Sequence, residues 1–295
     1  MSKERENKNQ VFRQGLAPDV QVQTGIQTMT AAERMRKEFG IVIVPAELVK
    51  LPSAGKIYSI ESGLNNREEI EIKAMTTREE DILTSRAYAK KGSTITELIR
   101  SCVVDKSVDV EQLISGDRNA LMVAIRITGY GAKLSPELKC PKCNETNHPE
   151  FDLSQVSIKP IGAEPVSPGV NEFECDLPVS KAKATFKLLT AKDEEDLVNQ
   201  HERKKKMFNS PVDTLMSDQL KMALLSVNGK RDRGALAFFV DNMPGQDSQA
   251  LRERMLEIKP DVDMKQLFEC EFCDLVEEVD IPIDREFFWP RSRKL

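Results

Sequence analysis

Histidine is scarce in this chain of 295 residues, which has only His148 and His201. The sequence contains no His-Glu-x-x-His helix, no phosphate-binding glycine loop of the Walker type and no Gly-x-Ser-x-Gly turn, so the parts of most hydrolase and nucleotide chemistries are missing. The acidic runs 79–81 and 194–196 are explained by the electrostatics of helix starts rather than by paired catalytic acids. We therefore predict no enzymatic activity, no catalytic residues and no small-molecule substrate.

Long apolar runs are also absent. The longest, such as 120–125, are far too short to cross a bilayer, and the first residues lack the apolar core of a signal peptide. We expect a protein that is made in a reducing cytoplasm and has no membrane partner. Its formal charge of -5 and pI near 5.4 argue against nucleic acid as a partner, because nucleic-acid binders usually carry a basic face.

Cysteine is present in a distinctive pattern. Four of the six cysteines form two Cys-x-x-Cys pairs, Cys140 with Cys143 and Cys270 with Cys273. This spacing lets one tight turn direct two thiolates at one metal, and two such turns complete a tetrahedral zinc site. Redox pairs or ordinary buried cysteines are the alternatives, but two matched pairs without a secretion signal favour Zn²⁺. Four thiolates leave no position for a reactive water, so the predicted zinc is structural.

The remaining candidates for the site have simpler explanations. His148 lies close to the first pair and is an alternative ligand, although a lone histidine in a polar turn is usually solvated. Cys102 and Cys175 each lie in an apolar pattern that is typical of small buried side chains.

The two pairs are separated by about 126 residues, and closing such a loop costs about 4 to 5 kcal/mol of chain entropy. Binding of structural zinc in small domains contributes about 10 to 16 kcal/mol, which exceeds that cost. Both pairs are flanked by strand-like segments, so we predict two hairpin knuckles of a zinc ribbon.

Four regions follow from the pattern of the chain. Residues 1–28 are polar and without period, which predicts a flexible arm that orders only on a partner. Residues 29–68 contain a helix with a capping box at Thr30 and Glu33 that stops at Gly40, an apolar run at 41–44 and a turn-rich loop at 51–58. Residues 69–160 form a first lobe with the first knuckle, and residues 161–295 form a second lobe with the second knuckle and an aromatic tail.

Periodicity and capping signals predict the elements of the two lobes. In the first lobe we expect a strand at 69–75 and a helix that begins with a capping box, either Thr76 with Glu79 or Thr77 with Glu80, and stops near Gly92. Further helices are expected at 94–104, 110–114 and 118–128. In the second lobe we expect a strand at 181–189, a helix that begins at 190, and helices at 214–227, 234–242 and 247–258. The fold class is therefore α+β.

The second lobe repeats the plan of the first. Each has a strand, a capped acidic helix start, further helices and a Cys-x-x-Cys pair, and Ala-Leu stands 20 residues before the pair in both. The acidic helix starts at Asp81 and Asp196 differ by 115 positions but Cys140 and Cys270 by 130, which predicts about 15 inserted residues. We infer an internal duplication in which zinc joins two related lobes, with chance similarity as the alternative.

The aromatic tail at 287–290 has two interpretations of equal weight: it packs onto its own chain, or it anchors in another subunit.

Several segments together resemble a known family. They are 75–83, 91–102, 116–121 and 127–131, followed by the first Cys pair. They are similar to the baseplate hub or hub-assembly proteins of T-even-like contractile-tailed bacteriophages. The resemblance covers about residues 50–155 and extends more loosely to the second pair.

This resemblance implies a structural or assembly protein of the virion tail, assembled in the host cytoplasm and bound to other baseplate or tail subunits. The alternative is a cytoplasmic zinc-ribbon adaptor that binds nucleic acid or a client protein.

Overall fold

The computed structural model describes residues 36–40, 46–208, 214–281 and 286–288. The chain divides into a unit of residues 1–43 and a unit of residues 44–295. In the first unit, residues 36–39 are helical and end at Gly40, which has φ +67° and donates its N–H to the Arg36 carbonyl at 3.1 Å. The predicted arm, the capping box at Thr30 and the apolar run 41–44 lie outside the described residues.

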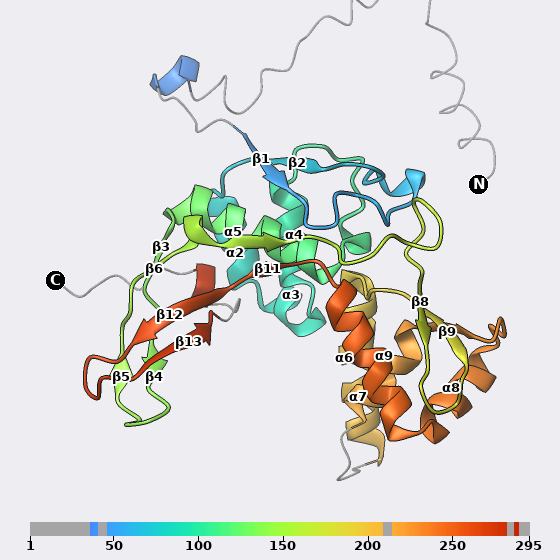
Figure 1. Ribbon diagram of the computed structural model, residues 1–295. Helices are drawn as coiled ribbons and strands as arrows, with labels where there is room; N and C mark the ends of the chain where they lie inside the picture. Colours follow the sequence, from blue (N-terminus) through green and yellow to red (C-terminus); the bar gives the residue numbers. More distant parts are fainter. Residues whose placement is uncertain (1–35, 41–45, 209–213, 282–285, 289–295) are drawn as a thin grey trace, which may run out of the picture. The chain divides into compact units, whose positions relative to one another are not determined.

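The larger unit mixes helices with short antiparallel strand pairs (Figure 1). Its first part contains β1 (Glu47–Lys50), η1 (Ile60–Ser62), β2 (Glu69–Ile72), α2 (Thr77–Thr84), α3 (Arg86–Lys91), α4 (Thr94–Cys102), η2 (Val110–Gln112) and α5 (Ser115–Tyr130). The first knuckle region contains β3 (Lys133–Leu134), β4 (Leu138–Lys139), β5 (Thr146–Asn147), β6 (Phe151–Asp152), η3 (Leu153–Gln155) and β7 (Ser157–Lys159).

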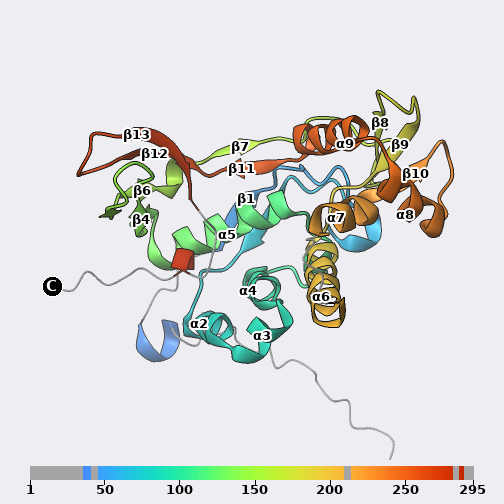
Figure 2. The same cartoon turned by 90° about the horizontal axis from the view of Figure 1, so that it is seen from below.

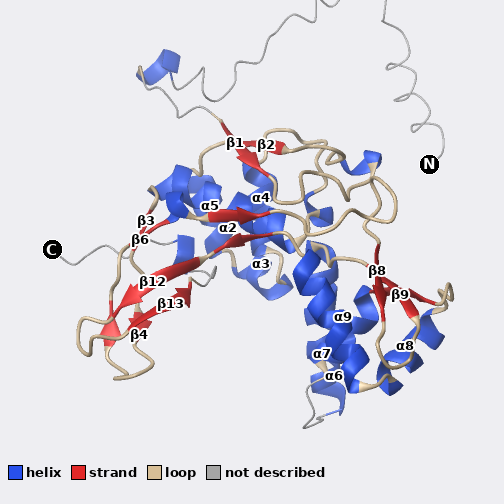
Figure 3. Ribbon diagram, in the orientation of Figure 1, coloured by secondary structure: helices blue, strands red, loops and turns tan. Residues whose placement is uncertain are grey.

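The later part contains β8 (Phe173–Asp176), β9 (Lys183–Phe186), α6 (Ala191–Phe208), α7 (Leu215–Ala223), β10 (Leu224–Val227), α8 (Arg233–Asn242) and α9 (Gly245–Ile258). It ends with β11 (Asp261–Asp263), β12 (Lys265–Glu269), β13 (Val276–Asp280) and η4 (Glu286–Phe288). Figure 3 distinguishes the helices from the strands. This mixture confirms the α+β character of the chain.

The predicted strand at 69–75 is shorter than expected. Strand β2 pairs with β1 from Glu69 to Ile72, with Ile70 and Ile72 buried and Glu69 exposed, as its period of two predicts. Beyond Ile72 the Lys73 N–H donates to the Cys102 carbonyl, at the end of α4, rather than to β1. The strand therefore ends where a distant helix takes over its hydrogen bonding.

The predicted helix from Thr76 to Gly92 is broken. Helix α2 begins with a capping box between Thr76 and Glu79, as expected, but ends at Thr84. Ser85 has extended dihedral angles, and α3 then runs to Gly92, whose φ of +74° ends it as predicted. The Thr84 hydroxyl donates to the carbonyls of Glu80 and Asp81, a local bond that competes with continuation of the helix.

A second correction concerns the predicted helix 214–227. Helix α7 ends at Ala223, and the next four residues form β10, which pairs with β9 in a three-stranded sheet ordered β10-β9-β8. Leu224 and Ser226 are buried against this sheet while Leu225 and Val227 are half-buried, so the segment alternates as a strand does. Pairing with β9 therefore overrides the helical pattern.

Helix α5 connects the parts of the larger unit. It packs against α4, β1 and β11, and Figure 2 shows the α5 ribbon alongside β1. Gly116 permits one of these contacts, because an added Cβ would lie 2.0 Å from the Pro260 carbonyl oxygen. The buried Arg126 near the other end donates to three carbonyls, including that of Phe287 at 2.9 Å. One apolar core surrounds this helix and includes residues from Val49 to Phe288.

The first two residues of the aromatic tail pack onto their own chain, which was one of the two interpretations. Phe287 and Phe288 are buried in this core and contact each other edge to face. Trp289 and Pro290 lie outside the described residues.

One arrangement of polar groups around a carboxylate occurs twice. Glu79 accepts hydrogen bonds from the Lys73 ammonium at 2.7 Å and the Thr76 N–H at 2.9 Å. Asp193 accepts the same two bonds, from the Lys187 ammonium at 2.6 Å and the Thr190 N–H at 3.0 Å. Each residue of the second group lies 114 positions after its counterpart in the first. The sequence comparison aligned Asp81 with Asp196, an interval of 115, and was therefore one residue out of register here.

A second pair of buried carboxylates lies at the starts of α5 and α9. Asp117 accepts bonds from the Ser53 N–H at 2.9 Å, the Ser53 hydroxyl and the Tyr58 hydroxyl, and its burial raises its pKa. Asp247 accepts from the Val179 and Ser180 N–H groups at 2.7 and 3.0 Å. Burial alone would raise the pKa of Asp247, but these N–H groups outweigh it and lower that pKa. Each carboxylate fastens a helix to a loop that follows a strand.

Glu79 makes the stability of the fold depend on acid. Desolvation opposes its charge, but bonds from Lys73, Ser101 and Thr76 outweigh that effect and lower its pKa from 4.5 to about 2. Its stabilising contribution is therefore complete above pH 4.5 and is lost as the pH falls toward 2. We predict that Glu79→Gln is less stable than the parent at pH 7 and that this difference shrinks between pH 4.5 and 2, as measured by urea unfolding.

The matched control is Asp81→Asn, because Asp81 is an exposed carboxylate on the same helix. A pH dependence in Glu79→Gln identical to that of the parent and of Asp81→Asn would contradict the assignment.

Candidate metal centre

Both Cys-x-x-Cys pairs lie at the tips of antiparallel hairpins, as the sequence predicts. The first lies between β4 and β5, and the second between β12 and β13. In the first hairpin the Cys140 N–H donates to the Glu145 carbonyl, and in the second the Cys270 N–H donates to the Leu275 carbonyl, both at 2.9 Å. The two turns therefore share the hydrogen bond that closes each of them.

The residue after each pair has a left-handed backbone. Asn144 has φ +61° and Asp274 has φ +53°. Asparagine and aspartate tolerate this conformation better than other residues that have a side chain. This local preference explains how each short sequence closes its turn and brings both sulfur atoms to one side.

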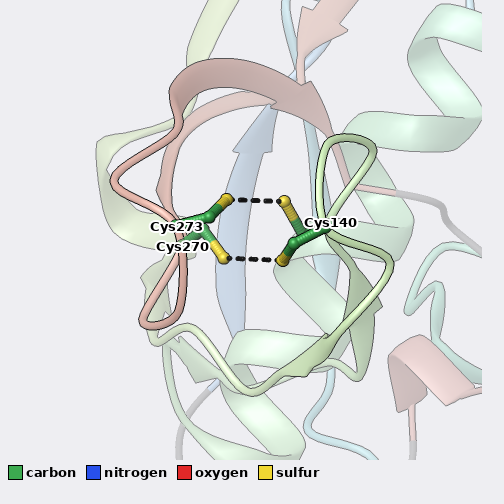
Figure 4. Close-up of side chains that lie close together, drawn as sticks. Cys140, Cys270 and Cys273 are labelled. Atoms are coloured by element: carbon green, nitrogen blue, oxygen red, sulfur yellow. Dashed lines mark hydrogen bonds between the residues drawn. The ribbon is translucent and has the colours of Figure 1, made fainter.

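The structure brings the four predicted ligands together. All four Sγ atoms lie within 4.8 Å of one another, with Cys140 to Cys273 at 3.5 Å and Cys143 to Cys270 at 3.7 Å (Figure 4). A disulfide would require a separation of about 2.0 Å. A tetrahedron of sulfur atoms about 2.3 Å from a central zinc has edges of about 3.8 Å. The donor set and its spacing therefore fit a four-thiolate zinc site.

Apolar residues enclose the sulfur atoms. Cys140 and Phe268 are each 1% exposed, and they form a small core separate from the main one. Leu138, Leu275 and Val279 pack around it. A metal held here would have apolar surroundings and four sulfur donors, which suits a structural role.

The thiols differ in their tendency to ionise. Burial opposes ionisation of Cys270, but the Phe272 N–H, which donates to its sulfur at 3.4 Å, and the neighbouring thiols lower its pKa to about 6. A backbone bond from Glu145 favours the Cys143 thiolate, but burial and the other three sulfur atoms raise that pKa to about 12. Close thiols disfavour simultaneous ionisation, and a bound cation would remove this repulsion.

Asn147 is a contact between the knuckles that sequence reasoning missed. Its side chain is 1% exposed, donates to the Glu145 carbonyl at 3.0 Å and accepts from the Glu271 N–H of the second knuckle at 2.9 Å. Lys142 also crosses, donating to the Cys273 carbonyl at 3.4 Å. Nothing in the local pattern identifies Asn147, because its role depends on a segment more than a hundred residues away.

The other candidates lie elsewhere. His148 is exposed and is not among the residues that gather around the sulfur atoms. Cys102 and Cys175 are buried in the main core, as predicted, and burial raises the pKa of Cys102 to about 12. The acidic runs are engaged in structural contacts, since Glu79 is part of the capping box and Glu194 pairs with Arg118 at 3.0 Å.

Comparison with known proteins identifies the family. The family described as T4 bacteriophage base plate protein matches residues 45–289, which is most of the chain. The chain belongs to this family. The match includes both knuckles and every helix and strand of the larger unit up to η4.

No curated protein and no solved structure matches the chain. Among the described helices of this baseplate-family protein, none has the length and apolar character that crossing a membrane requires.

The contact made by Asn147 can be tested separately from the cysteines. We predict that Asn147→Ala lowers the free energy of unfolding by about 1 to 3 kcal/mol, because it removes a buried side chain that bonds to both the Glu145 carbonyl and the Glu271 N–H. Denaturant unfolding measures this loss. His148→Ala, which changes an exposed neighbour, should change it by less than about 0.5 kcal/mol. Equal effects of the two variants would contradict this role.

Proposed function

We propose that this baseplate-family protein is a structural or assembly subunit of the hub region of a contractile phage tail. The match to the baseplate family over residues 45–289 is the observation that carries this proposal. In this function the protein acts by binding other baseplate or tail subunits after synthesis in the host cytoplasm. It requires no catalysis and no nucleic acid, and the excess of acidic residues opposes binding to phosphate backbones.

Zinc is the structural clasp in this proposal. Cys140, Cys143, Cys270 and Cys273 are its four ligands, and the spacing of their sulfur atoms supports this assignment. A closed shell of four thiolates would supply only stabilising bonds, with no position for substrate or water. The metal would fix the ends of a loop of about 126 residues whose closure costs about 4 to 5 kcal/mol.

The two lobes are copies of one ancestral unit in this proposal. Besides the buried carboxylates, the knuckles support it, because adding 130 to the numbers of Cys140 and Glu145 gives Cys270 and Leu275, which make the same bond. A second pairing follows the same offset. Leu134 pairs with Phe151, and the residues 130 positions later, Met264 and Ile281, are joined by a bond from the Ile281 N–H to the Met264 carbonyl. The first lobe comprises residues 69–160 and the second residues 161–295.

The metal assignment predicts one zinc ion per chain. Purified protein should contain equimolar zinc by elemental analysis, and Cys270→Ser should lose it together with at least about 4 to 5 kcal/mol of stability, because the contribution of the metal exceeds the cost of closing the loop. Cys102→Ala is the control, since it changes a buried cysteine outside the cluster and should retain full zinc. Zinc-free protein whose four clustered cysteines all react with an alkylating reagent would contradict the assignment.

The proposed function predicts the location of the chain. Quantitative peptide mass spectrometry on purified particles and isolated baseplates should find this chain at a fixed, small ratio to the tail-tube protein. Its presence only in tail-assembly intermediates would make it an assembly factor of the same structure. Absence from particles and from every tail intermediate, with salt-sensitive binding to DNA or RNA, would instead support the zinc-ribbon adaptor.

A further inference from the structure

The two knuckle hairpins have the same framework but different surfaces. The second hairpin is the longer, and in its register Leu267 lies opposite Glu278 and Val276 opposite Glu269. Side chains at these positions share one face of the β12–β13 pair, and Phe268 is buried on the other face toward the sulfur atoms. We call the first the outer face: Lys265, Leu267, Glu269, Val276, Glu278 and Asp280.

Large apolar side chains are exposed on and beside the outer face. Leu267 is 60% and Val276 55% exposed, and they are diagonal neighbours across the pair. Phe272, at the tip between the two cysteines, is 59% exposed. Exposure of apolar surface to water is unfavourable, so such a group on a two-stranded hairpin indicates a surface that is covered by a partner.

The first hairpin is an internal control for this argument. At the offset of 130 its residues in place of Leu267, Phe272 and Val276 are Glu137, Lys142 and Thr146. All three are polar, although both hairpins have the same closing hydrogen bond and each contributes two cysteines to the sulfur cluster. The zinc-ribbon framework therefore does not require apolar residues at these positions, and their presence on the second hairpin needs another cause.

Charge differs between the hairpins in the same way. Residues 261–281 contain eight acidic residues and one basic residue, a formal charge of -7, whereas the matching residues 131–151 contain three of each. The chain as a whole has a charge of -5, so all other residues together are slightly basic. In this hairpin only the half-buried Asp261 has an ion pair with a described residue, Lys259 at 2.9 Å. The exposed carboxylates form an unneutralised field around the apolar group.

We propose that the outer face with Phe272 is the docking surface for a segment of a neighbouring baseplate subunit that carries Lys or Arg beside large apolar side chains. Burial of the three apolar side chains supplies affinity, and the acidic rim selects and orients a basic partner. A second copy of this face is disfavoured because it would bring two sets of like charges together. The proposal rests on the function proposed above, since it assumes that neighbouring subunits exist.

Photo-cross-linking in phage-infected cells tests this surface. A benzoylphenylalanine side chain is placed at Leu267 or Phe272 of the full-length protein, and at the matched Glu137 or Lys142 as controls. Mass spectrometry then identifies the cross-linked peptides. We expect positions 267 and 272 to capture one Lys- or Arg-containing peptide of another baseplate subunit, with a yield about tenfold above that of the controls.

Three results would overturn the proposal: capture of the chain's own basic segment 289–295, capture of the same hairpin of a second copy, or equal yields at all four positions. The ratio of each variant to the tail-tube protein in purified baseplates is measured alongside. If the variants are present at the ratio of the parent chain, any of these three results contradicts the docking surface alone. If the parent chain itself is absent from baseplates, the proposed function has failed.

A triple variant of the second hairpin provides the second test. Leu267→Glu, Phe272→Lys and Val276→Thr replace its three exposed apolar residues with those at the matching positions of the first hairpin. Because the first hairpin folds with these residues, the variant should fold with unchanged zinc content and thermal midpoint. We expect its incorporation into baseplates to fall at least about tenfold, equivalent to about 1.4 kcal/mol, while Lys139→Ala, at an exposed position of the first hairpin, incorporates normally. Normal incorporation of a folded triple variant would exclude the outer face as a docking surface.

Discussion

The structure depends on the contact between two turns that are far apart in sequence. Knuckles at Cys140 and Cys270 meet through four sulfur atoms, and Asn147 joins their backbones independently of any metal. The chain between them, which includes the β8–β10 sheet and helices α6 to α9, begins at the first knuckle and ends at the second, beside the first. Just before the second knuckle the chain is held by pairing of β11 with β7 and by the close approach of Gly116 to Pro260. A chain with so many short strand pairs needs such closures, because an isolated two-stranded pair is marginal in water.

Similar arrangements of polar groups occur in both halves of the larger unit, with different chemistry. A lysine, a threonine and an acid meet at the start of α2 and of α6, and an aspartate fastens each of α5 and α9 to a loop. The environments of the two aspartates differ, since Asp117 accepts two hydroxyl bonds and one N–H bond, whereas Asp247 accepts two backbone N–H bonds and is also stabilised by the Ser180 side chain. Burial therefore dominates at Asp117 and raises its pKa, while the N–H groups lower the pKa of Asp247. The two aspartates therefore occupy similar positions at helix starts, although their pKa values shift in opposite directions.

The two knuckle hairpins share a fold but differ in their surfaces. The first knuckle is electrically balanced and polar where the second is acidic and apolar. The sulfur cluster and Asn147 connect the two hairpins within the larger unit. The match to the baseplate family includes both of them.

The sequence by itself determined the features that a few adjacent residues encode. The Cys-x-x-Cys turns, the capping box at Thr76, the stop at Gly92 and the alternation of β2 depend on local spacing and backbone preference, and all were predictable. The sequence also identified the baseplate family through several short segments. Tertiary structure alone decided the strand at Leu224 in place of helix, the burial of Glu79 with its bond from Ser101, and the bridging role of Asn147. Each of these depends on the partner that a residue meets across the fold, and local periodicity carries no information about a partner more than twenty residues away.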